Sequence, residues 1–304
     1  MPFTTSFKRL AVFDFDWTLV EADSDHWVMQ ELSPSLRDIQ MVEEGVVQWT
    51  DLQDKLLGML HEKGFRRSQL EATLQNIPFT TEMIEALEQL KSQGTYICIL
   101  SDANTVYIDI ILKAYGISHL IDRVITNPAY YDETERLHVQ RHHGLDLPPH
   151  GCPNPCAANL CKGQELDALM AVEDYDQVIY GGDGTNDFCA ALHLRPQDTV
   201  LARSGLGLEK QIKSSAGRLK ANVKYWQSTK DVLRFVRELC DASSTASTIQ
   251  PAKQDRVDRS TSSSRMSLDS TSSTAVDEHE YINDERSKVP ATPMVTAEPI
   301  AVAQ

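Results

Sequence analysis

Short apolar runs alternate with amphipathic stretches along the first 240 residues of the chain. Each run is too short to form a helix and ends in polar or small residues, so the runs predict buried strands. They cover residues 10–15, 95–100, 123–126, 177–181 and 199–202.

Between these runs, apolar residues recur three or four positions apart, which is the spacing of one helix face. Strands that alternate with helices predict an α/β fold, a doubly wound parallel sheet with helices on both faces. The clearest helical patterns are Met83, Ile84, Leu87 and Leu90, then Val106, Ile110 and Leu112, and finally Val232, Phe235, Val236 and Leu239.

One insertion interrupts this alternation directly after the first strand. Residues 21–78 contain a helical pattern at Leu52, Leu56, Leu57 and Leu60 but no good strand. Ligands of such sheets bind beyond the carboxyl ends of the strands. The insertion therefore predicts a small helical cap over an active site.

The chain changes character near residue 241. Residues 241–304 are rich in Ser, Thr, Asp and Glu, and they lack apolar periodicity. We expect a folded unit over residues 1–240 and a disordered tail after it, because such a composition buries too little surface to offset chain entropy. Arg259 and Arg265 lie among serines and make the tail a candidate kinase substrate, for instance at Ser262 or Ser267, with an unmodified solvating tail as the alternative.

Composition and charge narrow the function classes. The chain has 304 residues, 41% of them hydrophobic, and a net charge of −15. An acidic balance argues against non-specific nucleic-acid binding, which needs clustered Lys and Arg. No apolar run approaches the roughly 20 residues of a membrane span, and no signal peptide is evident. We expect a cytoplasmic protein whose six cysteines are reduced thiols.

Polar residues gather at the predicted carboxyl ends of the strands. Asp14 and Asp16 end the first strand, and two buried acids there are costly unless they are used or paired. Ser101 ends the second strand, Lys162 opens a helix, and Asp183 follows the fourth strand. This order lets the four positions converge at one edge of the sheet.

These motifs resemble those of the haloacid dehalogenase (HAD) superfamily of phosphohydrolases. The matching segments are DFDWT at 14–18, LSD at 100–102, Lys162 and GGDGTND at 181–187, within about residues 9–240. Further segments at 23–25, 101–105, 150–162 and 182–189 resemble the PHOSPHO-type branch, which includes phosphoethanolamine/phosphocholine and pyridoxal-phosphate phosphatases. Trp17 is a bulky residue at a variable position of the first motif.

The resemblance implies a role for each matched residue. Asp14 is the expected nucleophile, which forms an aspartyl phosphate. Asp16 is the expected general acid and then the base for water, with Thr18 orienting it. Ser101 donates to a phosphoryl oxygen, and Lys162 neutralises charge there.

A Mg²⁺ ion is the implied cofactor, because hard oxygen ligands suit it. The expected ligands are Asp14, the carbonyl of Asp16 and Asp183. Asp187 is a further candidate, directly or through water.

Two further acids, Asp25 and Asp102, lie near the expected site, with Asn104 as a third candidate for substrate binding. Extra carboxylates beside the phosphoryl group would repel it, so we expect Asp25 and Asp102 to face the other end of the substrate. That end would then be cationic, and Trp17 or Trp27 would add a cation–π contact. The alternative for Asp25 and Asp102 is helix capping.

The small phosphorylated metabolite that best fits these acids and the resemblance is phosphoethanolamine or phosphocholine, followed by pyridoxal phosphate and pyrophosphate. A non-catalytic HAD-fold regulatory protein is the alternative from a different class.

Three cysteines precede Lys162. Cys152, Cys156 and Cys161 lack the paired C-x₂-C spacing of common structural zinc sites, which favours loop packing over metal binding. Cys98 and Cys189 are interpreted as small core residues. Tyr130 and Tyr131, before a charged stretch, predict a hairpin.

Overall fold

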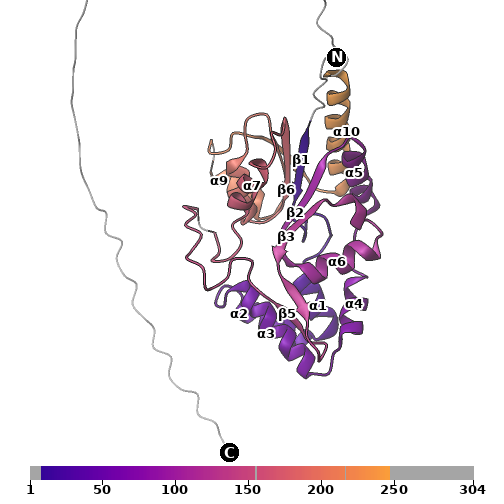
Figure 1. The fold of residues 1–304 in the computed structure, drawn as a ribbon, viewed down its shortest axis with the longest axis vertical. Coiled ribbons are helices and arrows are strands. Elements are labelled where there is room, and N and C mark those ends of the chain that lie inside the picture. Colours follow the sequence, from indigo (N-terminus) through magenta and orange to yellow (C-terminus); the bar gives the residue numbers. More distant parts are fainter. Residues whose placement is uncertain (1–7, 155, 216, 247–304) are drawn as a thin grey trace, which may run out of the picture. The chain divides into compact units, whose positions relative to one another are not determined.

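The computed structural model describes residues 8–246 except 155 and 216. Its centre is a six-stranded sheet in which every neighbouring pair is parallel (Figure 1), as the alternating pattern predicted. The order is β3 (Arg123–Asn127), β2 (Tyr96–Asn104), β1 (Arg9–Phe13), β6 (Gln177–Gly182), β7 (Thr199–Arg203) and β8 (Asn222–Trp226).

Side chains of each central strand alternate between two separate cores. In β1, Ala11 and Phe13 pack into one core, and Leu10 and Val12 into the other. Helices cover both faces (Figure 1). The first face carries α5 (Thr81–Ser92), α6 (Thr105–Ala114), the 3₁₀ turn η1 (Ser118–Leu120) and α10 (Thr229–Ala246), and the second α7 (Lys162–Met170), α8 (Asp187–His193) and α9 (Gly207–Ser214).

The insertion after β1 is the expected helical cap. Leu52, Leu56, Leu57 and Leu60 of its third helix are all buried, so the helical pattern marked a packed face. The cap consists of α1 (Ser24–Leu32), α2 (Pro34–Glu43), α3 (Trp49–Glu62) and α4 (Arg67–Leu74), and its apolar residues continue the core of the first face.

The predicted hairpin is present as β4 (Ala129–Tyr131) and β5 (Leu137–Val139), which pair antiparallel. It packs on the cap helix α3, where the Arg136 guanidinium donates to Asp54 at 3.1 Å and the amide of Val139 donates to the same carboxylate. Gly58 permits this crossing, because a Cβ there would lie 2.9 Å from the guanidinium. The hairpin therefore braces the cap against the sheet domain.

Two features differ from the sequence pattern. Strand β8 was not predicted, because it is an edge strand whose side chains are largely exposed and therefore lack an apolar run. Helix α10 continues to Ala246, past the expected domain boundary at residue 240. The expected tail from residue 247 onward, with Ser262 and Ser267, lies outside the described residues. Within the described part of the chain, no helix is long and apolar enough to cross a membrane.

Candidate active site

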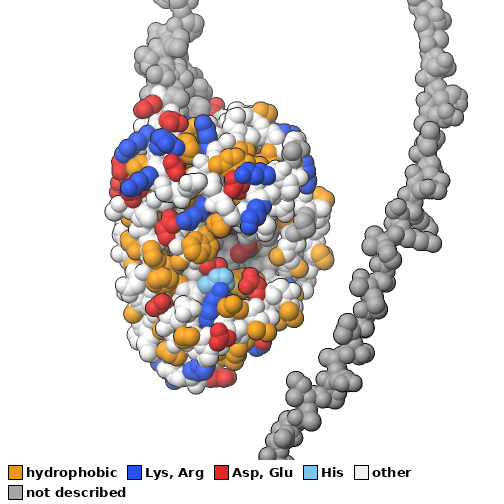
Figure 2. Space-filling model, turned by 180° about the vertical axis from the view of Figure 1, so that it is seen from behind, with side chains coloured by type: hydrophobic (Ala, Val, Ile, Leu, Met, Phe, Trp, Pro, Cys, Tyr) orange, Lys and Arg blue, Asp and Glu red, His pale blue; other side chains and the backbone are white. Residues whose placement is uncertain are grey.

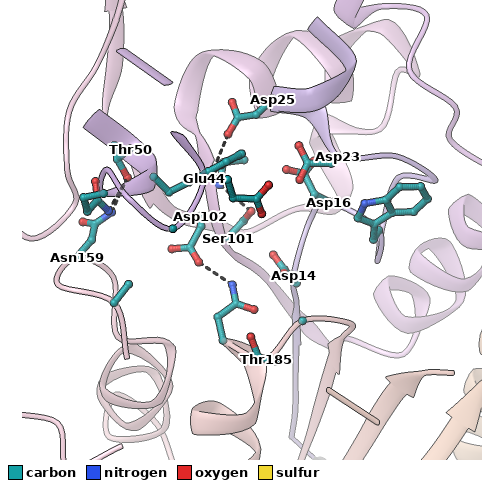
Figure 3. A pocket seen from close by; sticks show the side chains of 18 of the residues that line it. Asp14, Asp16, Asp23, Asp25, Glu44, Thr50, Ser101, Asp102, Asn159 and Thr185 are labelled. Carbon is teal, nitrogen blue, oxygen red and sulfur yellow. Dashed lines mark hydrogen bonds between the residues drawn. The ribbon is translucent and has the colours of Figure 1, made fainter. Parts of the chain in front are cut away.

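A cavity of about 730 Å³ lies between the carboxyl edge of the sheet and the cap. One face of the molecule is hollowed near its centre, with acidic side chains at the margin of the hollow (Figure 2). Asp14 and Ser101 line the cavity from the sheet, and Asp25 lines it from the cap (Figure 3). Asp183 lines it from the end of β6. The sequence motifs thus converge at one place, as their positions at strand ends predicted.

Asp14 sits at the floor of the cavity and is paired with Lys162. The Lys162 ammonium lies 2.6 Å from one Asp14 oxygen, and the amide of Phe15 donates to the other at 2.7 Å. Burial raises the pKa of Asp14 well above its usual value, although the charge of Lys162 opposes this. Burial alone would lower the pKa of Lys162, but Asp14 and Asp187 raise it, so this ammonium stays charged.

Asp187 is a buried hub that holds Lys162 and the turn after β6. One of its oxygens accepts from Lys162 at 2.8 Å and from the hydroxyl of Tyr180 at 2.7 Å. The other accepts from the backbone amides of Asp183 at 2.9 Å and Gly184 at 2.8 Å. Both oxygens are therefore engaged, which suits a positioning role beside the expected metal ligands.

Asp183 faces Asp14 from the end of β6. Burial and the charge of Asp187 raise its pKa to about 7. The Thr18 hydroxyl donates to Asp183 at 3.3 Å, whereas the sequence predicts that Thr18 orients Asp16.

Ser24 holds Asp16 instead. Its amide donates to one oxygen of the Asp16 carboxyl and its hydroxyl to the other, both at 3.0 Å. Burial raises the pKa of Asp16 well above its usual value, and the charges of Asp23 and Asp25 add to the effect. A carboxyl whose pKa is raised in this way is suited to donate a proton to a leaving oxygen.

The carboxylates at the floor fit a divalent cation. One oxygen each of Asp14, Asp183 and Asp187 lie within 4.8 Å of one another, in a site of oxygen donors only. Desolvation and mutual repulsion raise the pKa of Asp14 and of Asp183, and a bound cation would remove this penalty. Mg²⁺ held by Asp14 and Asp183 would neutralise charge on a phosphoryl group.

The cap end of the cavity holds further acids. The Asp25 carboxyl is buried and accepts from the indole N–H of Trp49 at 2.9 Å. Asp23, two residues earlier, accepts from the amide of His26 and is the N-cap of α1. The capping role considered for Asp25 therefore belongs to Asp23, and Asp25 points toward the cavity (Figure 3).

Asp102 also lines the cavity, where it accepts from the side-chain amide of Asn186 at 2.6 Å. The N-cap of the following helix α6 is Asn104, whose side chain accepts from the amide of Tyr107. Capping thus explains Asn104 rather than Asp102, and Asn104 is absent from the cavity lining. Ser101, buried beside Asp102, accepts from the amide of Ala103, which leaves its own hydroxyl proton for a ligand.

The two tryptophans considered for the headgroup have different surroundings. Trp17 lines the cavity with 40% of its surface exposed and φ of 56°, a conformation unusual for a bulky residue. Arg203 donates to its backbone oxygen and lies over its ring, which holds this turn in place. Trp27 instead donates to the backbone oxygen of Thr73, inside the cap.

Comparison with known proteins identifies the family. The model of the Putative Phosphatase family matches residues 9–240, which is most of the chain. The chain belongs to this phosphatase family. It is 36% identical over 236 residues to a thiamine phosphate phosphatase-like protein of Arabidopsis thaliana, covering 76% of this chain and 95% of that protein.

Two further relatives carry different activities in their names. The human pyridoxal phosphate phosphatase PHOSPHO2 is 32% identical over 76% of this chain and 98% of its own length. Inorganic pyrophosphatase 2 of Arabidopsis thaliana is also 32% identical, over 75% of this chain and 82% of its own. A substrate-bound phosphoserine phosphatase shares the fold, with a TM-score of 0.52 at 18% identity over 76% of this chain and 98% of that chain.

This phosphatase is therefore similar in sequence to the PHOSPHO2 enzymes and shares the fold of a phosphoserine phosphatase. The sequence interpretation missed three contributors. Ser24 lies inside a quoted motif, but only the fold brings it to Asp16. Tyr180 lies inside a run that predicts a buried strand, and Trp49 lies in the insertion, and each donates to a site carboxylate.

Proposed function

We propose that this phosphatase hydrolyses a phosphomonoester with a cationic headgroup, with phosphoethanolamine or phosphocholine as the best candidates, in a Mg²⁺-dependent reaction. The observation that carries the proposal is the composition of the cavity wall. Among the described residues, no Lys, Arg or His lines the cavity. Its lining carboxylates are Asp14, Asp16, Asp23, Asp25, Glu44, Asp102 and Asp183.

The phosphoryl step follows from the floor of the cavity. Asp14 attacks phosphorus and forms an aspartyl phosphate, while Lys162 stays beside it to offset the added negative charge. Ser101 is free to donate to a phosphoryl oxygen. Asp16 gives its proton to the leaving oxygen and then takes one from the water that cleaves the acyl phosphate.

The headgroup would lie toward the cap. An ammonium or quaternary ammonium group there gains attraction from Asp25 and Asp102, and from the face of Trp17. An anionic second phosphate would meet the same carboxylates and be repelled, which argues against pyrophosphate.

Thiamine phosphate is a second candidate, because its thiazolium ring is cationic and the relative of 36% identity carries that substrate in its name. Pyridoxal phosphate, named for the PHOSPHO2 relatives, is the runner-up among less cationic substrates.

The test is phosphate release with Mg²⁺ from a panel of these five compounds and glycerol phosphate, whose headgroup is uncharged. Asp25→Asn and Asp102→Asn should lose activity selectively on the cationic substrates. Asp38→Asn, which changes an exposed cap acid outside the cavity, is the matched control and should behave as wild type. If the variants lost as much activity on glycerol phosphate as on the cationic substrates, or lost no activity on any substrate, neither acid would recognise the headgroup.

A further inference from the structure

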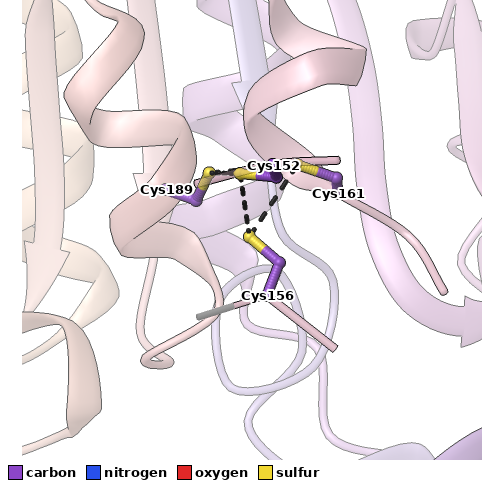
Figure 4. A group of neighbouring side chains, drawn as sticks. All are labelled: Cys152, Cys156, Cys161 and Cys189. Atoms are coloured by element: carbon purple, nitrogen blue, oxygen red, sulfur yellow. Dashed lines mark hydrogen bonds between the residues drawn. The ribbon is translucent and has the colours of Figure 1, made fainter. Parts of the chain in front are cut away.

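Four cysteine sulfurs meet beside the active site (Figure 4). Cys152 and Cys156 belong to the loop before α7, Cys161 is the N-cap of that helix, and Cys189 lies in α8. Sγ of Cys152 lies 3.6 Å from those of Cys156 and Cys189. Sγ of Cys161 lies 3.8 Å from that of Cys156 and 3.9 Å from that of Cys189.

These distances match the edges of a metal–thiolate tetrahedron. Four Zn–S bonds of about 2.3 Å in tetrahedral geometry separate the sulfurs by about 3.8 Å. A disulfide needs about 2.05 Å, far shorter than any of the four distances. An iron–sulfur cluster spreads its cysteines over several iron atoms, so not all of their sulfurs lie this close. We propose that Cys152, Cys156, Cys161 and Cys189 bind a structural zinc ion.

A bound metal would explain how the irregular loop that carries three of these cysteines keeps a fixed course. Apart from residue 155, which lies outside the described residues, residues 140–161 form neither helix nor strand, and so long an irregular segment is uncommon inside a compact domain. Ala157, Ala158 and Asn159 of this loop nevertheless line the active-site cavity. A zinc ion that joins the loop to α7 and α8 would hold this wall of the cavity in place.

The surroundings are arranged for thiolate sulfurs. The side-chain amide of Asn154 donates to Cys189 at 3.3 Å, and the backbone amide of Asn154 donates to Cys152. Such outer contacts orient and stabilise metal ligands. Gly163 allows α7 to approach the cluster, because a Cβ there would lie 2.6 Å from the Cys189 sulfur.

The cluster is distinct from the carboxylate site and independent of the proposed substrate. It offers four sulfur ligands, which select zinc over Mg²⁺, and leaves no open position for chemistry. Its link to catalysis is positional, since Cys161 directly precedes Lys162 and Cys189 follows Asp187 by two residues. Spacing along the chain favoured packing for three of these cysteines, and the fourth ligand became visible only in the fold.

The test is the metal content of the full chain, expressed with zinc supplied and purified without chelators. Elemental analysis by inductively coupled plasma mass spectrometry should find one zinc atom per chain in the wild type. Cys98→Ala, which changes a buried cysteine outside the cluster, should keep the metal. The double variant Cys152→Ser and Cys156→Ser should lose it.

Cobalt substitution of the wild type gives a readout that does not depend on how the variants fold. Co²⁺ in this site should show the intense visible bands and the sulfur charge-transfer band of a tetrahedral cobalt thiolate. Zinc far below one atom per chain, iron in its place, zinc retained by the double variant, or disulfides among these cysteines would each overturn the proposal.

Discussion

The two ends of the cavity are formed by different parts of the fold. At the sheet end, Asp14, Asp183 and Asp187 follow strands or open a helix, and buried Lys162 lies among them. At the cap end, Asp25 and Glu44 come from a helical insertion and line a wall without cations among the described residues. The sheet end therefore suits the phosphoryl group, and the cap end suits a positive headgroup.

This contrast separates reaction from specificity. Strand ends are fixed by the hydrogen bonds of a buried sheet, so groups placed there hold the geometry that phosphoryl transfer requires. In the proposed function, cap residues would contact the headgroup from helices that share a core with one face of that sheet. Changes at Asp14, Asp183 and Asp187 should then affect all substrates alike. Changes at Asp25 of the cap, and at Asp102 on the cavity wall, should depend on the headgroup.

The largest effect is expected for Asp14→Asn. An amide is a poor nucleophile and carries no charge for a metal or for Lys162, so turnover should fall on the order of 10⁴-fold or more on every substrate. Phosphate release and circular dichroism check activity and fold. Asp174→Asn, at an exposed acid, is the control. Near-normal activity in folded Asp14→Asn protein would end the covalent proposal.

Asp16→Asn should lower kcat by roughly 10²–10⁴-fold, because the leaving oxygen loses its proton donor. The defect should shrink for p-nitrophenyl phosphate, whose leaving group departs without protonation. Comparing both substrates in single-turnover experiments separates this role from a general disturbance of the site. An equal defect on both would assign Asp16 another role.

Mg²⁺ should stabilise the protein more at pH 8 than at pH 5. The pKa of Asp183 is raised to about 7 in the folded protein, so the folded state holds this proton more tightly than the unfolded chain. Metal-free stability contributed by this group is thus full at low pH and falls as pH rises from about 4 to about 7.

At saturating Mg²⁺ we expect a rise in Tm of about 5–10 °C at pH 8, from roughly 2.7 kcal/mol at a hundredfold excess over Kd. Thermal unfolding with Mg²⁺ or a chelator at both pH values measures it, and Asp183→Asn should lose most of the shift. Equal shifts at both pH values would contradict the assignment.

The smallest effect is expected in the pH dependence of KM. Burial, with the charge of Asp23, raises the pKa of Asp25, so this carboxyl ionises only as pH rises. A cation binds the ionised form better, and KM for phosphocholine should fall several-fold with rising pH relative to KM for glycerol phosphate. Asp25→Asn should remove this difference and Asp38→Asn should keep it. Parallel profiles in the wild type would exclude Asp25.

The sequence predicted the sheet end better than the cap end, for a physical reason. Buried strands leave apolar runs, and acids directly after them stand out, which located Asp14 and Asp183. Edge strand β8 leaves no such run because it is half exposed. The contact of Ser24 with Asp16 joins the cap to the end of a strand, and the contact of Trp49 with Asp25 joins two cap helices. Local sequence patterns do not predict such contacts between separate elements.

The most direct test of the division between the two ends compares phosphocholine with 3,3-dimethylbutyl phosphate, its uncharged isostere, on the wild-type enzyme. The two substrates have the same shape and phosphoryl group, so only the headgroup charge differs. We expect kcat/KM for phosphocholine to exceed that for the isostere by about tenfold or more, which corresponds to roughly 1.4 kcal/mol. Equal values, or a preference for the uncharged compound, would contradict this division.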